Sequence, residues 1–590
     1  MEKKTGVALG LALLALASVV LAFLPALQAG FIWNDHTYIT ENPTLDGLSG
    51  LRRIWTDPLA NEQHYPLVFT TFWIEKRLWG LDPFGYHLVN VLLHALAALL
   101  LWRFLRRLGL PAAWLAAAAF ALHPVCVESV AWVTERKNTL SLVLTLLAAH
   151  AWLSWREAAE ERDAAATESR EKRKRKRGPA APAPLHRRPA ALWLAALALL
   201  VLALFAKTTA SVLPAVLLVV VWWQRGRIRW ADVRPLLPFF AVGAGLAFHT
   251  AWIEKNFVVA KGDEWSHGLV DRLALAGQVT AFYASKIAWP ADLAFIYRRW
   301  TLDAGSAVQW LPTAGWLAAL AVAFAASRRG HRGPLAGLLL FGGVLFPAMG
   351  FFNVYAMRYS WVADHFAYQA VAVGTACAVC GAAAALERFL PSWRRAAAGA
   401  GLAGLVVLGT LSHRQAVPYR SQEALWLHTI AVNPECFICH TNYGSDLLEA
   451  GRTDEAVAHL EKSLRIKPDA LPTLLNLARL EEGRERFGKA EEHLRAALRL
   501  EPADTEVRVH LATIYTKSGR LSDAEREFRE ALKAPSNAAY LAHNGLGVVL
   551  VRSGRVEEGI EHLKECVRLR PDYERGRANL ATVLELTGAR

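Results

Sequence analysis

The sequence predicts an all-α protein in which a polytopic helical membrane domain precedes a helical solenoid. Apolar runs long enough to cross a bilayer recur up to about residue 411, and each crossing helix needs about 20 such residues. After that point the chain is charged, although 54% of the whole sequence is hydrophobic. This charged part repeats with a period of 34 or 35 residues, which is typical of stacked helix pairs.

Eleven apolar runs are candidate spans. They cover residues 6–29, 86–102, 111–127, 138–153, 190–206, 211–223, 235–252, 311–327, 334–351, 366–386 and 396–411. We expect the first run to remain as a span, because it is longer than the roughly 7–15 apolar residues of a signal peptide. Residues 272–289 are apolar but interrupted by polar side chains, which predicts a re-entrant or interfacial helix.

The distribution of charge argues against a nucleic-acid partner, despite a net charge of +14. Lys and Arg gather in short loops between spans, most densely as KRKRKR at 172–177. Because short cytoplasmic loops carry the Lys/Arg excess, we expect a solvated, disordered cytoplasmic loop at 156–189 and a cytoplasmic N-terminus. Eleven crossings then place residues 31–85 and the C-terminus outside the cytoplasm.

The last domain is built from internal repeats. Small residues, a large apolar residue and a proline recur at fixed offsets, first as Gly444, Ala456, Leu460, Ser463 and Pro468. The same offsets return three more times, and Ala581 opens a fifth set. The pattern resembles tetratricopeptide repeats, in which small residues lie where two helices cross. Such a solenoid presents a concave surface, so we expect it to bind a peptide or protein, with a plain spacer as the alternative.

These observations define the expected domains. Residues 1–412 form the membrane domain, 413–434 a connecting helix, and 435–590 four full tetratricopeptide repeats and a partial fifth.

The polar segments between the spans carry a more specific resemblance. FIWNDHTYITENP, HYPLVFTTFWIEKRLWGLDPFGYHLVNVLLH, ALHPVCVESVAWVTERKNTL, WPADLAFIYRRW and RYSWVADHFAY occur in this order. Together they resemble the transmembrane and tetratricopeptide-repeat O-mannosyltransferases of animals and their bacterial relatives. That family belongs to the GT-C membrane glycosyltransferases. The resemblance implies transfer of a sugar from a polyprenyl phosphate by a catalytic carboxylate in the first extracytoplasmic loop.

Asp35 is the candidate for that carboxylate. A polyprenyl-phosphate sugar already carries a good leaving group, so the enzyme needs a general base for the acceptor hydroxyl but no general acid. A base opposite the phosphate would invert the anomeric carbon. The family often has two acidic residues here, whereas this chain has Asn34 and Asp35. The alternative role for Asp35 is an N-cap of a loop helix, with Thr37 as a rival cap.

The departing phosphate requires fixed cations. The candidates are Arg136 and Lys137 in VTERKN, then Arg298 and Arg299 in YRRW, and next Arg358 and Lys207. His123 and Glu128 could line the same pocket, and His64 could touch donor or acceptor. The alternatives are interfacial snorkelling for the cations, a structural Glu128–Arg136 pair, and an ordinary loop histidine at position 64. His87, Asn90 and His94 share one face of a span, which predicts hydrogen bonds between helices.

The six cysteines predict neither haem nor zinc. CFICH at 436–440 matches the C-x-x-C-H pattern for haem attachment, but no distal ligand is evident, so we interpret it as a coincidence. A bond between Cys436 and Cys439 would be strained inside a helix. Cys377 and Cys380 indicate small-residue packing in a span.

The sequence thus favours a polyprenyl-phosphate-dependent glycosyltransferase that moves a monosaccharide, with mannose as the candidate, to a hydroxyl of an exported protein. Its expected partners are the donor lipid, a protein acceptor at the repeats and the bilayer. No cofactor is expected; the single loop carboxylate favours a site without metal, and a divalent-metal requirement stays open. The rival is a non-catalytic membrane scaffold whose repeats recruit envelope proteins. The Ala/Arg-rich composition favours a bacterial inner membrane with periplasmic repeats.

Overall fold

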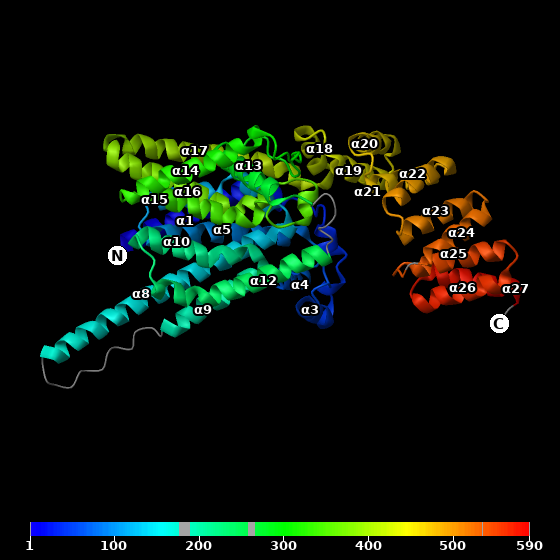
Figure 1. The fold of residues 1–590 in the computed structure, drawn as a ribbon, viewed down its shortest axis with the longest axis horizontal. Helices are drawn as coiled ribbons and strands as arrows, with labels where there is room; N and C mark the ends of the chain where they lie inside the picture. The colour runs from blue at the N-terminus through cyan, green and yellow to red at the C-terminus, as the bar shows by residue number, and fades with distance from the viewer. Residues whose placement is uncertain (1, 176–188, 258–265, 534, 589–590) are drawn as a thin grey trace. The chain divides into compact units, whose positions relative to one another are not determined.

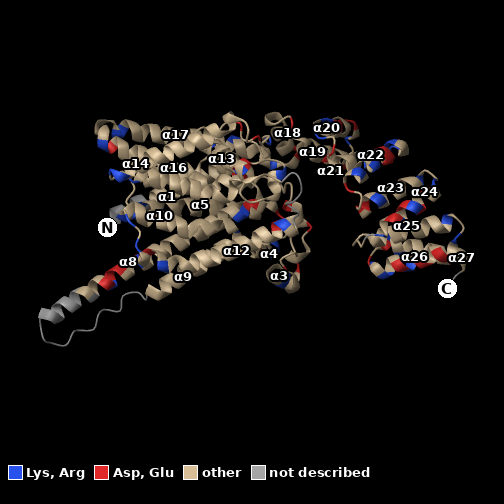
Figure 2. Cartoon of the chain, viewed as in Figure 1, with Lys and Arg blue, Asp and Glu red and all other residues tan. Residues whose placement is uncertain are grey.

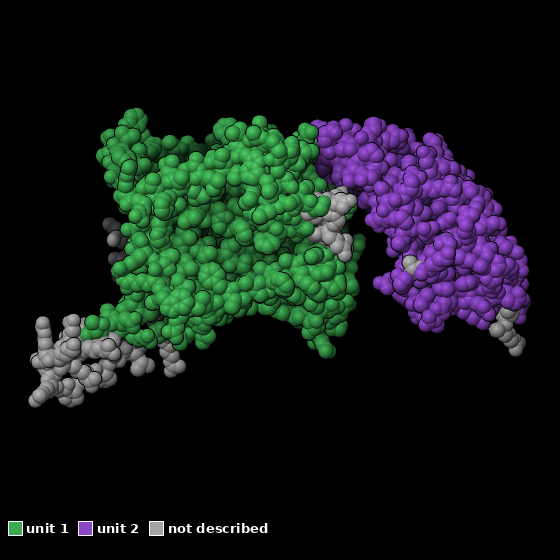
Figure 3. All heavy atoms as spheres, viewed as in Figure 1, with its two compact units in different colours: residues 1–433 green, residues 434–590 purple. Residues whose placement is uncertain are grey.

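A computed structural model describes residues 2–175, 189–257, 266–533 and 535–588. All regular elements among these residues are helical, which confirms the all-α prediction. The chain divides into two compact units, Met1–Asn433 and Pro434–Arg590 (Figure 3). Charged side chains are spread over the second unit, whereas the long helices of the first are mostly uncharged (Figure 2).

The first unit contains eighteen α-helices among its described residues, joined in places by short 3₁₀ or π turns. They are α1 Glu2–Ala22, α2 Leu24–Leu27, α3 Gly47–Thr56, α4 Pro66–Trp79, α5 Pro83–Arg107, α6 Ala113–Ala121, α7 Val127–Ala131, α8 Arg136–Arg175, α9 Pro189–Ala206, α10 Leu213–Arg225, α11 Trp230–Val233, α12 Leu237–Asn256, α13 Leu269–Ala288, α14 Leu311–Arg328, α15 Gly333–Leu345, α16 Tyr368–Phe389, α17 Arg394–Ala416 and α18 Gln422–Val432.

Seven stretches of helix in the described residues are long and apolar enough to cross a membrane. They are Pro83–Arg107, Pro189–Ala206, Thr208–Arg225, Trp230–Asn256, Ala307–Arg328, Asp364–Phe389 and Pro391–Arg420. An eighth is possible if α6 and the helical turns over Pro124–Ala131, which meet at 51°, form one broken span. The predicted count of eleven is therefore not reached.

The other three predicted spans do not meet the length and hydropathy test within the described residues. Among those residues α1 contributes the apolar stretch Leu9–Ala22, and the helix at Gly333–Ala348 is similarly short. Helix α8 starts with the charged pair Arg136 and Lys137 and runs for 40 residues into a charged second half. The loop expected at 156–189 is thus helical as far as Arg175, and residues 176–188 lie outside the described part of the chain. Helix α13 is not among the candidate spans, in agreement with the expectation for 272–289.

The long helices of the first unit run side by side (Figure 1), with α8 packed against α5 and α9, and α16 against α6. The segment between α1 and α5 folds onto one end of this bundle. Its aromatic side chains Tyr38, Phe69 and Phe72 form a core with Tyr86 of α5 and Val133. The segment that carries Asp35 is therefore a packed part of the fold.

Helix α18 belongs to the first unit. The Trp426 ring lies 4.9 Å from the Trp33 ring, and His428 Nε2 lies 3.0 Å from the carbonyl oxygen of Leu293. The connecting helix was expected at 413–434, but the boundary between the units lies after Asn433.

The second unit consists of paired helices. These are α19 Phe437–Glu449, α20 Thr453–Ile466, α21 Leu471–Gly483, α22 Phe487–Leu500, α23 Thr505–Lys517, α24 Leu521–Ala531, α25 Ala539–Arg552, α26 Val556–Leu569 and α27 Glu574–Thr587. The repeated small residues lie where the helices of a pair cross. A Cβ on Gly547 of α25 would come within 2.8 Å of the Gly559 carbonyl oxygen in α26, so this crossing requires glycine.

Candidate active site

Asp35 is fully buried and accepts three hydrogen bonds. Its Oδ1 accepts from the backbone N–H of Thr134 at 2.8 Å and from the Thr134 hydroxyl at 2.6 Å. Its Oδ2 accepts from the backbone N–H of Ile32 at 3.1 Å. The carboxylate makes no side-chain cap on the π-helical turn His36–Thr40, so the N-cap alternative is wrong. Instead it joins the segment between α1 and α5 to Thr134, two residues before the start of α8.

Burial raises the pKa of the Asp35 carboxyl toward neutral pH. Loss of solvent raises its pKa from 3.8 to about 6, while the hydrogen bonds from Thr134 and Ile32 and the charge of His36 act in the opposite direction. A carboxylate with a pKa close to the working pH suits general base catalysis. Since Oδ2 has only one donor among the described residues, it keeps a lone pair for a further O–H donor.

The backbone before Asp35 is held in an unusual conformation. Trp33 has φ of +49°, in the left-handed region that costs a non-glycine residue about 1–3 kcal/mol. Its N–H donates to Gln422 Oε1 at 3.0 Å, and its ring packs on Phe295 and Trp426. These contacts fix the direction in which the Asp35 side chain leaves the backbone.

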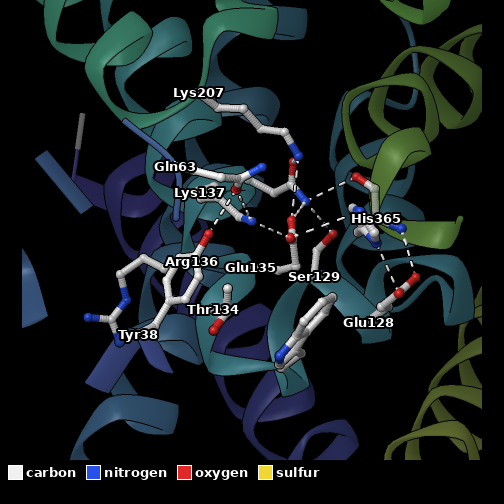
Figure 4. Close-up of polar contacts among 12 residues, drawn as sticks. Tyr38, Gln63, Glu128, Ser129, Thr134, Glu135, Arg136, Lys137, Lys207 and His365 are labelled. Atoms are coloured by element: carbon white, nitrogen blue, oxygen red, sulfur yellow. Dashed lines mark hydrogen bonds and ion pairs between the residues drawn. The ribbon is translucent and has the colours of Figure 1, made fainter. Parts of the chain in front are cut away.

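A second cluster is centred on Glu135, directly after Thr134 (Figure 4). Glu135 Oε1 lies 2.8 Å from Lys137 Nζ, and Oε2 lies 3.4 Å from Lys207 Nζ. Asn138 Nδ2 donates to Glu135 Oε2 at 2.7 Å, while Lys207 Nζ donates to Asn138 Oδ1 at 2.7 Å. The carboxylate thereby holds two ammonium groups in one place.

The charges around Glu135 outweigh its burial. Burial alone would raise its pKa, but His365, Lys137 and Lys207 hold the pKa well below the usual range, so Glu135 is ionised. Burial lowers the pKa of Lys207, against the attraction of Glu135. The two ammonium groups are fixed cations of the kind that stabilise a phosphate, while Glu128 and Glu254 also lie close enough to interact with Lys207 and Lys137.

His365 connects this cluster to Glu128. Its Nδ1 lies 2.9 Å from Glu128 Oε1, and its backbone N–H donates to Glu128 Oε2 at 2.9 Å. Its Nε2 is 4.0 Å from Glu135 Oε1. Glu128 therefore positions His365 beside the lysine pair.

The segment between α1 and α5 also contributes side chains to the Glu135 cluster. Gln63 Oε1 accepts from Lys137 Nζ at 3.1 Å and from the Tyr38 hydroxyl at 2.9 Å. Gln63 Nε2 lies 3.5 Å from Glu254 Oε1 of α12. Lys137 thus contacts the same folded segment that carries Asp35.

Arg136 lies in a different environment from Lys137. Its guanidinium is fully buried and donates to Asn90 Oδ1 at 2.8 Å, the Tyr86 carbonyl at 2.6 Å and Thr71 Oγ1 at 3.3 Å. It also forms an ion pair with Glu75. The structural Glu–Arg pair considered for Arg136 thus exists with Glu75 of α4, whereas Glu128 binds His365.

The remaining predicted residues lie on other elements. His123 is buried, with Nδ1 accepting from the Val125 N–H and Nε2 at 3.0 Å from the Ile287 carbonyl. The half-buried ring of His64 lies 5.5 Å from that of His249, and burial lowers the pKa of His64. Arg298 and Arg358 are exposed, and the Arg299 guanidinium stacks over Trp361 at 4.3 Å.

The polar residues of α5 bond between helices, as predicted. His87 lies against the Gly30 carbonyl, Asn90 against the Val130, Trp132 and Val133 carbonyls, and His94 against the Tyr368 hydroxyl and the Ala121 carbonyl. Asn90 therefore supports the backbone that leads to Thr134.

Sequence reasoning missed Glu135, His365 and Gln63. Glu135 sits inside the VTERKN segment between Thr134 and Arg136, and His365 lies in VADHFAY, so both were in quoted motifs without being singled out. Their contacts with Lys207, Lys137 and Glu128 include separations of 72, 74 and 237 residues, for which spacing along the chain offers no signal.

Cys436 and Cys439 form a disulfide, and the expected location of this pair inside a helix is corrected. Cys436 is the N-cap of α19 rather than an internal helical residue, so its Cα lies 5.3 Å from that of Cys439. That separation is within the ordinary range for disulfides. In the described part of the chain, no three or more His, Cys, Asp or Glu side chains are grouped to hold a metal.

Comparison with known proteins concerns the repeats. Residues 481–542 and 540–573 match models of the tetratricopeptide repeat. The C-terminal unit is a tetratricopeptide-repeat solenoid. Solved structures similar to it include Pseudomonas aeruginosa pilF, at 20% identity over 26% of this chain and 69% of that chain, with a TM-score of 0.25. MamA from Desulfovibrio magneticus RS-1 is 17% identical over 27% and 90% of the chains, also at 0.25. Scores this low carry no functional inference.

The repeat region is distantly homologous to protein O-mannosyl-transferases, which confirms the resemblance over that region. It is 35% identical over 156 residues to Drosophila melanogaster Tmtc1, covering 24% of this chain and 17% of the relative. Over 150 residues it is 27% identical to F38B6.6 of Caenorhabditis elegans, covering 23% and 22%. Over 152 residues it is 34% identical to human TMTC1, covering 23% and 17%. The matches thus span 17–22% of these relatives' lengths.

The raised pKa of Asp35 makes the stability of the folded protein depend on pH, and the substitution Asp35→Asn removes this contribution. Because its folded-state pKa is about 6 and its ordinary value 3.8, the native state retains a proton that the unfolded chain loses between these values. The stability from Asp35 is therefore fully present below pH 3.8 and is lost as the pH rises through about 6. We expect the Tm of the wild type minus that of Asp35→Asn to fall between pH 4 and pH 7 in a thermal-shift measurement.

The control for this prediction is Thr134→Val, which removes only the hydroxyl donor. Since that donor lowers the pKa of Asp35, its loss should extend the decline to higher pH. At every pH, Asp35→Asn should itself be less stable by about 1–3 kcal/mol, because its amide can accept at only one of two positions that face N–H donors. A Tm difference that does not change with pH would contradict the assignment.

The Arg136–Glu75 pair predicts a large stability effect. Glu75→Gln leaves a fully buried guanidinium without its counter-charge, which costs about 3–5 kcal/mol for such pairs. Asp46→Asn is the matched control, because the Asp46–Lys76 pair has an Asp side chain that is 67% exposed and should contribute at most about 1 kcal/mol. Equal Tm values for the two variants in detergent would show that Arg136 does not depend on Glu75.

Proposed function

We propose that this chain is a GT-C membrane glycosyltransferase that transfers a monosaccharide from a polyprenyl phosphate to a hydroxyl of an exported protein, with inversion. One observation carries the proposal: Asp35 hydrogen-bonds Thr134, and the next residues of the chain, Glu135 to Lys137, begin the cationic cluster. A base and a phosphate site are thereby supported by one short segment.

In this proposal Lys137 and Lys207 bind the donor phosphate. Each ammonium has three donors and uses some of them on Glu135, Asn138 or Gln63, so a phosphate oxygen can take another. Charge that develops on the departing phosphate is stabilised by cations already fixed in place. Arg298 and Arg299 remain proposed donor contacts, and Arg358, His64 and His123 proposed pocket residues.

Arg136 supports the same site indirectly. Its bonds to Glu75, Asn90 and the Tyr86 carbonyl use all three guanidinium nitrogens, so we assign it to holding the first turn of α8. Lys137 and the Glu135 carboxylate lie directly on either side of it in sequence. The phosphate role predicted for Arg136 passes in this proposal to the two lysines.

Asp35 is the proposed general base. Its Oδ2 accepts the proton of the acceptor hydroxyl as the oxygen attacks the anomeric carbon, and the bond to the phosphate oxygen breaks on the opposite face. A positioned base contributes about 10²–10⁴-fold to such a step. The Thr134 hydroxyl keeps the carboxylate oriented through the reaction.

We infer a periplasmic placement from charge and topology. The proposal counts α1, α8 and α15 as spans in addition to those that meet the length and hydropathy test, which gives about eleven. Under the positive-inside rule the basic segment around Arg175 is then cytoplasmic, and Asp35 and the repeats are extracytoplasmic. In a bacterial inner membrane that side is the periplasm.

The repeats are proposed to hold the protein acceptor. Tetratricopeptide solenoids present extended concave binding surfaces, and the homologous repeats belong to proteins named protein O-mannosyl-transferases. This likeness makes mannose the first donor sugar to test.

The second candidate function is a non-catalytic membrane scaffold. It is favoured by one observation, the presence of Asn34 beside Asp35 where the resembling family often has two acids. In that reading the repeats recruit envelope proteins, and Asp35 only joins two segments of the fold.

Transfer assays distinguish the two functions. With polyprenyl-phosphate mannose in proteoliposomes, we expect Asp35→Asn to reduce transfer by at least about 10²-fold while donor binding is kept. The double variant Lys137→Gln/Lys207→Gln should weaken donor binding. Lys76→Gln is the matched control, because Lys76 pairs with the exposed Asp46 and should leave both unchanged.

The pH dependence of kcat/KM tests the catalytic role of Asp35 separately from its effect on stability. The wild-type kcat/KM should rise with pH through about 6 as Asp35 loses its proton, and Thr134→Val should move this limb to higher pH. Normal transfer by Asp35→Asn would eliminate the base assignment. Absence of transfer by the folded wild type with mannose and other sugars would favour the scaffold.

Sidedness is tested by cysteine labelling. We expect a membrane-impermeant maleimide to label Arg520→Cys but not Arg175→Cys in intact cells, and both after permeabilisation. Labelling of both before permeabilisation would contradict the proposed topology, and with it an extracytoplasmic Asp35.

A further inference from the structure

Two histidine pairs in the second unit have the geometry of metal ligands. In the first, His440 Nδ1 of α19 lies 2.8 Å from His459 Nδ1 of α20. In the second, His543 Nδ1 of α25 lies 2.9 Å from His562 Nδ1 of α26. Both pairs are 19 residues apart in sequence, and both connect the two helices of one repeat.

Not every repeat has histidine at these two equivalent positions. In the third repeat the corresponding contact is an ion pair, Arg508 NH1 to Glu527 Oε2 at 2.9 Å. In the second repeat, Leu474 and His493 occupy the same positions, so a single histidine has an apolar residue opposite it. The two His–His pairs are thus specific to the first and fourth repeats.

The separation of the nitrogens suits a shared metal. Imidazole nitrogens bound at about 2.0–2.1 Å, with an angle between a right angle and a tetrahedral one, lie roughly 2.9–3.4 Å apart. The observed 2.8 and 2.9 Å therefore need only a small opening of each pair. Imidazole is a preferred ligand of Zn²⁺, Ni²⁺ and Cu²⁺.

The first pair also has the supporting contact typical of metal-bound histidine. His440 Nε2 lies 3.2 Å from the carbonyl oxygen of Pro434, which can only accept, so Nε2 carries the proton. The Nδ1 lone pair of His440 then points at His459, which donates its own Nδ1 proton to it. Burial lowers the pKa of both rings, which favours the neutral forms that bind metals.

From this geometry we propose that His440 and His459 form a divalent transition-metal site, and that His543 and His562 form a second, weaker one. On binding, the proton on His459 Nδ1 is transferred through solvent to Nε2, so that both Nδ1 atoms coordinate the metal and no net proton is lost. Water completes the coordination, because Glu455, four residues before His459 on α20, is held by Arg452 at 2.8 Å through both carboxylate oxygens.

The weaker affinity of the second site follows from its surroundings. Among the described residues, neither of its rings has a backbone carbonyl contact of the kind that Pro434 gives His440. An outer contact of this type is worth about 10–100-fold in metal affinity. Both arginines and glutamates act on the two rings, so local charge does not rank the two sites.

Equilibrium dialysis of the full-length protein without a polyhistidine tag against Cu²⁺ tests the proposal. The expected results are loss of the tightest equivalent in His459→Gln, loss of a weaker equivalent in His562→Gln, and loss of both in the double variant. His493→Gln is the matched control: it occupies the equivalent position without a histidine opposite, and its binding curve should equal that of the wild type. Gln can still hydrogen-bond to the remaining ring, and an unchanged Tm without metal would verify folding.

A spectroscopic readout separates ligation from general stabilisation. Electron paramagnetic resonance of the first equivalent of Cu²⁺ should show nitrogen coordination in the wild type and in His493→Gln, with changed coupling in His459→Gln. Wild-type stoichiometry and affinity in the double variant, or a first equivalent whose spectrum is unaffected by His459→Gln, would overturn the proposal. Neither result bears on glycosyl transfer, because the histidine pairs lie in the repeat unit.

Discussion

The hydrogen bonds between Asp35 and Thr134 are the constraint on which the first unit's polar architecture depends. A fully buried carboxylate is tolerated only when its oxygens are satisfied, and Asp35 obtains two of its three donors from one residue 99 positions away. The bond fixes the start of α8, where five consecutive side chains take five different partners. Thr134 binds Asp35, Glu135 the lysines, Arg136 Glu75, Lys137 Gln63, and Asn138 Ser129.

These buried charges fall into two kinds with different consequences. Arg136 and Glu75 neutralise one another, and the remaining guanidinium donors are used on neutral acceptors, while Glu75 Oε2 is buried without a hydrogen-bond partner among the described residues. Glu135 instead contacts two lysines and lies 4.0 Å from His365, and Glu128 and Glu254 also act on those lysines. Adjacent residues of the chain therefore belong to a single ion pair on one side and to a network of several charges on the other.

The sequence predicted the helices and repeats better than it predicted which side chains contact one another. Helical periodicity and repeat spacing identified the all-α fold, the paired helices and the apolar segments, because those signals are local. The 51° bend between α6 and the helical turns over Pro124–Ala131 makes one predicted span a broken span or a re-entrant segment among the described residues. Motif resemblance singled out Asp35 and Arg136, and the structural alternative for Arg136 was a pair with Glu128, whereas Arg136 pairs with Glu75 and Glu128 with His365. Such choices are made by tertiary packing, which side-chain spacing along one chain does not encode.

The element before the repeats is also tied to the segment that carries Asp35. Helix α18 supplies Gln422, which accepts from the Trp33 N–H, and Trp426, which packs on the Trp33 ring. Trp33 precedes Asp35 by two residues and holds a left-handed conformation that these contacts maintain. Under the proposed function, a protein held by the repeats is tethered, through α18, to the segment with the proposed base. Tethering of this kind raises the effective concentration of a bound partner without any new contact, whatever the relative placement of the two units.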